Sequence, residues 1–481
     1  MYQPLSYVCP ALLVAATCVA ADAQQSDIRQ QASTAMRTAA TFYREQVASH
    51  GGYVYHYSLD LQQRWGEGEA TIDQIWVQPP GTPTVGLAFL RAYSATGDKF
   101  YLDAATDAAV AIAYGQLKSG GWTNSVDFNP SSKLVADYRN GKGRGRNNSS
   151  LDDGQTQSAI QLMIHADKAL NFQHKSIHEC ARIALDALLK AQFPNGGFPQ
   201  VWTGPVEQQP VLRASFPDYD WRTEGRIKNY WDMYTLNDNV TGYVADTLLD
   251  AHRIYDDERY LQAVRNLGDF LLLAQMPEPQ PGWAQQYSYQ MQPIWARRFE
   301  PPGVSGDETQ EVLETLVKIA QATGDRKYVE PIPRALGWLQ RSVLPDGQIA
   351  RYYELKTNRP LYMTRRGDKY SLTYDDFDLP SHYGWKTELR VEEIKKRYQT
   401  VGATRPTEAS KQTAAPTEQQ VKQVISDLDE RGRWVSTYRG ERLVGQAKFA
   451  ENSQYLSSQV FSDNLTLLSD FLEVGAQRSS E

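Results

Sequence analysis

Runs of apolar residues at helical spacing recur in pairs along the chain, and a glycine-containing loop with aromatic residues follows each pair. Repeated helical hairpins cannot bury their apolar faces alone and must stack side by side. We therefore predict an all-α fold, an incomplete α/α toroid of helical hairpins with long loops on one rim and a few short strands. The first helices cover residues 85–98, 159–170, 240–255 and 311–325, and the second cover 101–117, 180–193, 260–276 and 334–344.

The loops after the second helices are related to one another. They read SGGWTNSVDF from Ser119, NGGFPQVW from Asn195, PGWAQQYSY from Pro281 and DGQIARYYEL from Asp346, with an earlier copy, HGGYVYHY, from His50. In any one copy, glycine ending a helix under an aromatic lid is a sufficient explanation. Five copies on one rim favour a lined cleft, so we expect Phe198, Gln200 and Trp202 to face a sugar substrate.

Carboxylates precede the first helices, which begin at the same rim. Each of them can be a helix cap or a first-turn acid. If two or three converge, they form an oxygen-rich site of the kind that Ca²⁺ prefers. The residues concerned are Asp73, Asp152, Asp153, Asp238, Asp307 and Glu308.

Basic residues are concentrated in residues 350–380, although the formal net charge of the chain is -7. Guanidinium groups bind carboxylates through paired hydrogen bonds, so an acidic substrate is compatible with such a segment, although exposed loop charges explain some of these residues. The overall acidity argues against nucleic acid as a partner. The basic residues are Arg351, Lys356, Arg359, Arg365, Arg366 and Lys369, with Arg297 and Arg298 in a second patch.

The first 23 residues are typical of a secretory signal peptide, with an apolar run that ends in Ala21-Asp22-Ala23. A lipid-attached Cys18 is the alternative. Without this segment Cys180 is the only cysteine, so no intrachain disulfide can form. We expect a secreted or periplasmic protein with one domain over residues 24–481, interrupted by a polar loop or linker near residues 400–419.

Four segments, in order, resemble the hallmark segments of family 10 polysaccharide lyases, the pectate lyases with an incomplete α/α toroid. They are NGGFPQ, TLNDNV, WARRFEPPGVSGDE and RYYELKTNRPLYMTRRGDKY, and the resemblance covers about residues 30 to 390. It implies a calcium-dependent β-elimination in polygalacturonate. A base removes the C5 proton beside the uronate carboxylate, the C4 glycosidic oxygen leaves, and a 4,5-unsaturated end results.

The resemblance also implies roles for individual residues. Asp152 and Asp238 correspond to residues that hold calcium or position the substrate, and Asn237 to a substrate-binding residue. Arg297 and Arg351 correspond to arginines that bind uronate carboxylates. Arg365 falls where the family has its catalytic base, and the adjacent Arg366 leaves the register open by one residue. Asn239 stands where the family commonly has a second carboxylate, and Lys356 or Lys369 are alternative bases.

Two other functions remain open from the sequence. An α/α-toroid glycoside hydrolase would use Asp152 and Asp238 as its two carboxylic acids. A non-catalytic oligogalacturonide-binding protein would keep the cleft without turnover. The departures that keep this alternative open are Asn239 and Arg366, which stands where the family usually has an aspartate after its base arginine. In each case we expect a monomer that binds an acidic polysaccharide or its oligomers, with neither nucleic acid nor a membrane as partner.

Overall fold

The structure is a computed structural model of the 481-residue chain, and it describes residues 11–222, 229–401 and 415–478. The expected linker near residues 400–419 lies largely outside the described residues. Within the described ranges, none of the helices combines the length and apolar character needed to cross a membrane. The expected signal segment overlaps the helix α1 (Ala11–Phe42), which continues past residue 23.

The chain forms two compact units, and each has its own helices. The first unit comprises Met1–Trp76, Pro80–Ala111 and Lys411–Glu481. In it α12 packs against both α1 and α2, and α11 packs against α1. Its other helices and its strands are α2 (Thr82–Thr96), most of α3 (Lys99–Tyr114), α11 (Glu418–Ser426), α12 (Ser458–Arg478), β1 (His56–Ser58), β2 (Arg64–Trp65), β3 (Gln74–Trp76), β16 (Val435–Thr437) and β17 (Gln454–Ser457). Four of these strands form an antiparallel sheet in the order β16-β17-β1-β2.

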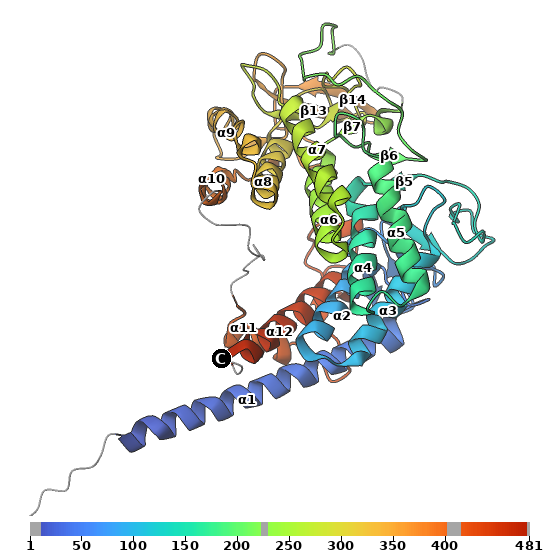
Figure 1. The fold of residues 1–481 in the computed structure, drawn as a ribbon, viewed down its shortest axis with the longest axis vertical. Coiled ribbons are helices and arrows are strands. Elements are labelled where there is room, and N and C mark those ends of the chain that lie inside the picture. Colours follow the sequence, from blue (N-terminus) through green and yellow to red (C-terminus); the bar gives the residue numbers. More distant parts are fainter. Residues whose placement is uncertain (1–10, 223–228, 402–414, 479–481) are drawn as a thin grey trace, which may run out of the picture. The chain divides into compact units, whose positions relative to one another are not determined.

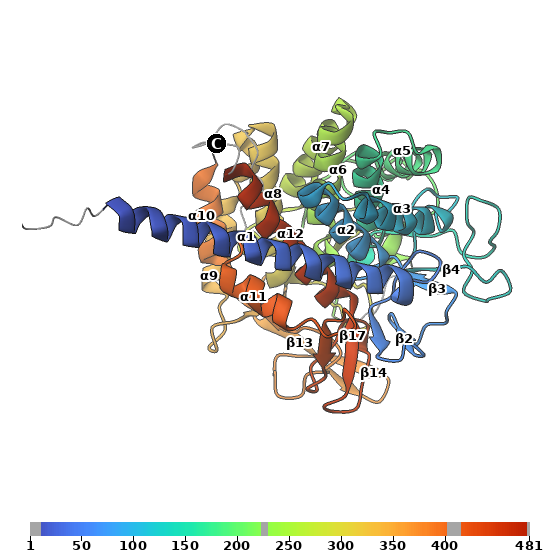
Figure 2. The ribbon, with the colours of Figure 1, turned by 90° about the horizontal axis from the view of Figure 1, so that it is seen from below.

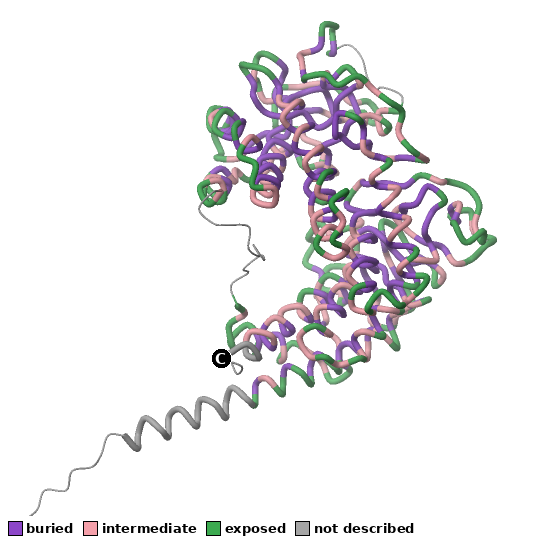
Figure 3. Tube along the Cα trace, in the orientation of Figure 1, coloured by how far each residue is buried: buried purple, intermediate pink, exposed green. Residues whose placement is uncertain are grey.

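The second unit, residues 77–79 and 112–410, contains the remaining helical hairpins. Helix α4 packs against α6 and α6 against α8, while α5 and α7 pair with α4 and α6 as an outer row (Figure 2). Buried residues line the faces between these helices (Figure 3). The predicted helical hairpins are thereby confirmed. Their bounds are α4 (Gln155–Ala169), α5 (Lys175–Lys190), α6 (Val240–Tyr255), α7 (Glu258–Ala274), α8 (Gly306–Thr323), α9 (Ile332–Arg341) and α10 (Val391–Thr400).

Short antiparallel strands join the loops of the second unit to the starts of its first helices, and Figure 1 shows the labelled ones at one end of the hairpins. Five of them form a sheet in the order β14-β13-β12-β10-β8, and the pairs β5-β6, β7-β9 and β11-β15 stand alone. The expected few short strands are therefore present. Their bounds are β4 (Ser125–Asp127), β5 (Ser149–Ser150), β6 (Val201–Trp202), β7 (Tyr234–Thr235), β8 (Trp283–Ala284), β9 (Gln286–Tyr287), β10 (Val304–Ser305), β11 (Ile349–Ala350), β12 (Tyr352–Tyr353), β13 (Pro360–Arg366), β14 (Lys369–Thr373) and β15 (Lys386–Thr387).

In two of the loops the first aromatic residue after the glycine turn is a buried lid on the preceding helix. The indole of Trp122 donates a hydrogen bond of 2.8 Å to the carbonyl of Ile112, near the end of α3, and Trp283 bonds Leu271 of α7 in the same way. In both loops a threonine of the next first helix accepts from the backbone N–H of the tryptophan at 3.0 Å. The lid explanation therefore holds for these aromatic residues, and the threonines, Thr156 and Thr309, define a common register for the repeat.

Replacing Gly196 with alanine is expected to destabilise the protein by roughly 3 kcal/mol, the sum of a strained backbone and an overpacked contact. Gly196 has φ +91°, and an added Cβ would lie 1.8 Å from the backbone oxygen of Asn266. Gly324 is the matched control, because its φ is +72° but nothing lies within 4 Å of an added Cβ. There the change should cost about 1 kcal/mol. Urea unfolding of both variants measures the difference, and equal losses would contradict the contact.

Candidate active site

Helices α4 and α6 begin with the same unusual turn. The 3₁₀ segments η2 (Asp152–Gly154) and η4 (Asn237–Asn239) precede them, and the middle residues Asp153 and Asp238 have left-handed backbone angles, φ 46° and 49°. By their positions in η2 and η4, Asp153 corresponds to Asp238 and Asp152 to Asn237. Left-handed conformations are costly for residues other than glycine and gather at functional sites. The side chains of these two turns are therefore candidates for a functional site.

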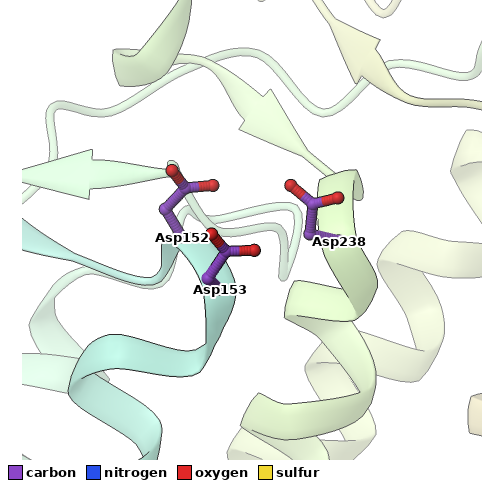
Figure 4. A group of neighbouring side chains, drawn as sticks. All are labelled: Asp152, Asp153 and Asp238. Atoms are coloured by element: carbon purple, nitrogen blue, oxygen red, sulfur yellow. The ribbon is translucent and has the colours of Figure 1, made fainter. Parts of the chain in front are cut away.

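These turns bring three carboxylates together in the second unit. One oxygen from each of Asp152, Asp153 and Asp238 lies within 4.8 Å of the other two, and Figure 4 shows the side chains of η2 facing that of η4. Burial, and next the negative charge of Asp238, raise the pKa of Asp152 to about 6. A bound cation would relieve this repulsion, and three carboxylates are the hard oxygen donors that Ca²⁺ or Mg²⁺ takes. The residues therefore fit a divalent cation.

Amide side chains orient all three carboxylates, as outer-shell groups commonly orient metal ligands. The hydrogen bonds run from Gln200 Nε2 to Asp152 Oδ1 at 2.7 Å, from Gln78 Nε2 to Asp153 Oδ2 at 3.0 Å, and from Asn237 Nδ2 to Asp238 Oδ2 at 2.5 Å. Asn237 is itself buried. Two of the predicted substrate-binding residues, Gln200 and Asn237, thus contact the predicted metal ligands directly.

Gln200, Gln285 and Arg351 occupy one position of the loop repeat, two residues after the lid position. Gln200 bonds Asp152, and Gln285 Nε2 bonds the equivalent residue Asn237 at 2.5 Å. The repeat therefore places a donor beside each of the two turns. Our sequence reasoning missed Gln285, although aligning PGWAQQ with GGFPQV would have found it.

Arg351 is buried among acidic groups. Its Nη2 bonds Glu308 Oε1 at 2.7 Å and lies 3.4 Å from Asp238 Oδ1, and its Nη1 lies 3.5 Å from Asp307 Oδ2. Burial raises the pKa of Glu308 to about 7, against the opposing charge of Arg351. Although burial acts in the opposite direction, Glu308 and its neighbours raise the pKa of Arg351, so the guanidinium stays charged. Its Nε has no hydrogen-bond partner among the described residues.

Arg297 begins the turn of residues 297–300, between β9 and β10, and its side chain is 40% exposed. Its Nη2 forms an ion pair of 2.6 Å with Glu300, whose side chain is buried. Burial would lower the pKa of Arg297, but the bond to Glu300 raises it above the ordinary arginine value. Burial and Asp238 raise the pKa of Asp152, and the positive charge of Arg297 opposes this rise. Arg297 is therefore a protonated, accessible cation that acts on the carboxylate cluster.

Arg365 lies at the end of β13, where its recorded bonds stay within the β13–β14 hairpin. Its Nε donates to the carbonyl of Gly367 at 2.7 Å, and its Nη2 lies 3.6 Å from Asp368. The guanidinium carbon is 5.5 Å from the ring of Tyr370, its partner across the hairpin. Tyr370 packs against Phe299, with ring centroids 5.6 Å apart. Aromatic contacts thus join this hairpin to the turn of Arg297, and the catalytic role of Arg365 stays a prediction.

Phe198 and Trp202 are buried, with 0% and 4% of their surface exposed. The indole of Trp202 donates to the carbonyl of Ser119 at 3.1 Å, and the backbone of Trp202 pairs with Ser149 in the strand pair β5-β6. Both rings support the loop that carries Gln200. Their predicted contact with a sugar stays a prediction.

The sequence reasoning weighed Asp153 as a rim carboxylate without choosing it as a ligand, and it also missed Glu300, Tyr383 and Gln78. Glu300 bonds Arg297, Tyr383 lies 4.8 Å from the guanidinium carbon of Arg351, and Gln78 bonds Asp153. The signal for Asp153 was its neighbour Asp152. Tyr383 and Gln78 come from segments that carried no recognisable pattern.

Comparison with known proteins finds a family match over part of the chain. The model of the pectic acid lyase family matches residues 116–350, and no curated sequence matches this chain. Among solved structures, a family 10 polysaccharide lyase from Cellvibrio cellulosa is 21% identical, with a TM-score of 0.47, over 67% of this chain and 98% of its own. A variant of it in complex with trigalacturonic acid gives the same identity and TM-score over 66% and 98%. A cellobiose 2-epimerase from Bacillus thermoamylovorans is 13% identical, with a TM-score of 0.45, over 94% and 100%.

Proposed function

We propose that this protein, whose residues 116–350 match the model of the pectic acid lyase family, is a polysaccharide lyase that cleaves polygalacturonate by calcium-assisted β-elimination. One observation carries the proposal beyond the family. The carboxylates of Asp152, Asp153 and Asp238 converge beside two protonated arginines, Arg297 and Arg351. A cation site next to anion-binding groups suits a uronate substrate, whose carboxylate must be neutralised before the C5 proton becomes acidic.

The chain's own residues have distinct roles in this reaction. Asp152, Asp153 and Asp238 would hold the calcium ion, which when bound supplies positive charge beside a uronate carboxylate. Arg297 and Arg351 bind uronate carboxylates and hold the sugar ring in place. Arg365 removes the C5 proton, the electron pair forms the C4–C5 double bond, and the C4 oxygen leaves and takes a proton from water.

Asn239 does not remove the capacity for calcium. It stands where the family commonly has a second carboxylate, but Asp153 adds a third carboxylate to the cluster from η2. The backbone N–H of Asn239 donates to Glu311 Oε2 at 3.1 Å, so this residue helps to fix η4. We therefore keep calcium as the metal.

Arg297 is a second candidate for the base because its charge acts on Asp152, whereas the recorded bonds of Arg365 lie within its hairpin. Against it, Glu300 raises the pKa of Arg297, which favours the protonated form. We therefore retain Arg365 as the base and Arg297 as a carboxylate-binding residue.

We also propose that residues 1–23 are a secretory signal and that a monomeric enzyme acts in the periplasm or outside the cell. The proposal is supported by the apolar run that ends in Ala21-Asp22-Ala23 and by a polymeric substrate. N-terminal sequencing of the secreted protein tests the cleavage site.

Polygalacturonate incubated with the protein and calcium should develop the ultraviolet absorbance of a 4,5-unsaturated product. EDTA should abolish it, and added calcium should restore it. Asp238→Asn should lose the response to calcium because a ligand is removed. Asp246→Asn is its control, since Asp246 lies on the same helix and pairs with Lys318 at 2.7 Å.

The product distinguishes the alternatives. New reducing ends without the absorbance would indicate a glycoside hydrolase. Binding of oligogalacturonides without any product would indicate a non-catalytic protein. Either result would reject β-elimination.

A further inference from the structure

Two of the segments that resemble the lyase family contain a glutamate that the proposed reaction does not use. Glu300 is the sixth residue of WARRFEPPGVSGDE, and Glu354 is the fourth residue of RYYELKTNRPLYMTRRGDKY. Both side chains are nearly inaccessible, 2% and 3% exposed, and each is paired with an arginine. Ionised carboxylates are rarely buried without a reason, because desolvation disfavours the charged form.

Four donors surround the carboxylate of Glu300. Its Oε1 accepts from Arg297 Nη2 at 2.6 Å, from Gln285 Nε2 at 2.9 Å and from the hydroxyl of Tyr383 at 3.2 Å. Its Oε2 accepts from the backbone N–H of Arg297 at 2.8 Å. Although burial raises it, the pKa of Glu300 is lowered overall, first by the side chain of Arg297. Glu300 is therefore a fixed anion.

This arrangement fixes the guanidinium of Arg297 on several sides. Nη2 is bonded to Glu300, and the guanidinium carbon lies 5.1 Å from the ring of Phe299 and 5.9 Å from that of Tyr383. The arginine side chain nevertheless stays 40% exposed. One edge of the guanidinium is bonded to the buried Glu300, while another edge remains accessible to a carboxylate. Because the guanidinium is already ordered, less entropy is lost when a carboxylate binds.

Hydrogen bonds through Gln285 also connect Glu300 to the turn that carries Asp238. Gln285 donates both to Glu300, at 2.9 Å, and to Asn237, at 2.5 Å, and Asn237 bonds Asp238. A displacement of Glu300 would therefore alter the positions of both Arg297 and the turn that carries Asp238.

We propose that Glu300 is the positioning residue of Arg297, which sets the direction in which this guanidinium meets a uronate carboxylate. The inference rests on the proposed function for its ligand, an acidic oligosaccharide, but it concerns binding and not proton transfer. Glu300 itself does not touch substrate.

The test compares Glu300→Gln, Glu300→Asp, Arg297→Lys and the double variant Glu300→Gln/Arg297→Lys. Glutamine keeps the shape but loses the charge, and we expect KM to rise about tenfold or more with a smaller change in kcat, as for other outer-shell partners. Aspartate keeps the charge and should lie between the wild type and Glu300→Gln. The double variant should be no weaker than Arg297→Lys alone, because both changes remove one coupled unit.

Glu354→Gln is the matched control. Glu354 Oε1 accepts from Arg222 Nη2 at 2.8 Å and from the hydroxyl of Tyr374 at 2.6 Å, so this variant also weakens a buried glutamate–arginine pair. It should reduce thermal stability to a similar extent and leave KM within about twofold, a small change on the scale of outer-shell effects. Equal KM effects at Glu300 and Glu354, or additive effects in the double variant, would overturn the proposal.

Calorimetric binding of trigalacturonate in EDTA supplies a readout that does not depend on turnover. A weaker Kd in Glu300→Gln, not further weakened by Arg297→Lys, supports the inference even if no lyase product forms. An unchanged Kd together with wild-type lyase activity rejects the inference and leaves the proposed function intact.

Discussion

Replacing Arg365 with lysine is expected to lower kcat on polygalacturonate by a factor of about 10² to 10⁴, the usual contribution of a positioned general base. KM should change little, because the carboxylate-binding arginines remain. The structure favours a clean comparison, since Arg365 lies on an exposed hairpin and contacts Gly367, Asp368 and the ring of Tyr370. The fold should therefore survive the change, which circular dichroism can verify.

Two other arginine variants decide the assignment. Successive side chains of a strand point to opposite faces, so Arg366→Lys tests the alternative register on the same strand. Arg297→Lys should raise KM more than it lowers kcat. For Arg365→Ala, added guanidine should restore part of the activity. Full activity in Arg365→Lys, with kcat lost in Arg297→Lys, would move the base to Arg297.

Replacing Arg351 with methionine is expected to lower the free energy of unfolding by about 3 to 5 kcal/mol, because it leaves buried carboxylates without their counter-charge. Arg351 bonds Glu308 at 2.7 Å and lies close to Asp238 and Asp307. Arg253→Met is the control. Arg253 is 66% exposed and pairs with Asp250 three residues earlier, so its loss should cost less than about 1 kcal/mol.

The decrease in the free energy of unfolding caused by Arg351→Met should depend on pH. In the folded protein the pKa of Glu308 is about 7, above its ordinary value of 4.5, so the folded state binds more protons than the unfolded state between these values. Stability attributable to this group therefore falls as pH rises. Arg351 lowers this pKa, so removing the arginine raises it further. Urea unfolding should show a larger deficit near pH 8 than near pH 5, and a deficit independent of pH would contradict the coupling.

The helical hairpins could be predicted because each helix must bury one face, and burial leaves a 3.6-residue period in the sequence. The period shows clearly in α6 and α7. It failed to reveal α10 (Val391–Thr400), whose buried residues are Val391 and Ile394. A short, charged helix at the edge of α8 carries too few apolar positions for a pattern to form.

The candidate site was only partly predictable. Asp152 and Asp238 were found because each precedes a helical run, and the structure brings their carboxylates together. Gln78 and Tyr383 were missed because the side chains that they contact, Asp153 and Arg351, lie in segments that are distant in sequence, and no local pattern records a contact of that kind. For the aromatic residues of the loops the sequence left a helix lid and a cleft lining both open, and the structure shows that the indoles of Trp122 and Trp283 each donate their N–H to the end of the preceding helix.

The matching turns before α4 and α6 also bear on how such a site could arise. Each hairpin contributes one left-handed aspartate, Asp153 or Asp238, and one amide donor from its own following loop, Gln200 or Gln285. Each hairpin, with its following loop, therefore supplies half of the left-handed aspartates and half of the amide donors of the site. Tandem duplication of one ancestral hairpin would create a two-sided ion pocket in one step, and later divergence at Asp152 and Asn237 would make its halves unequal.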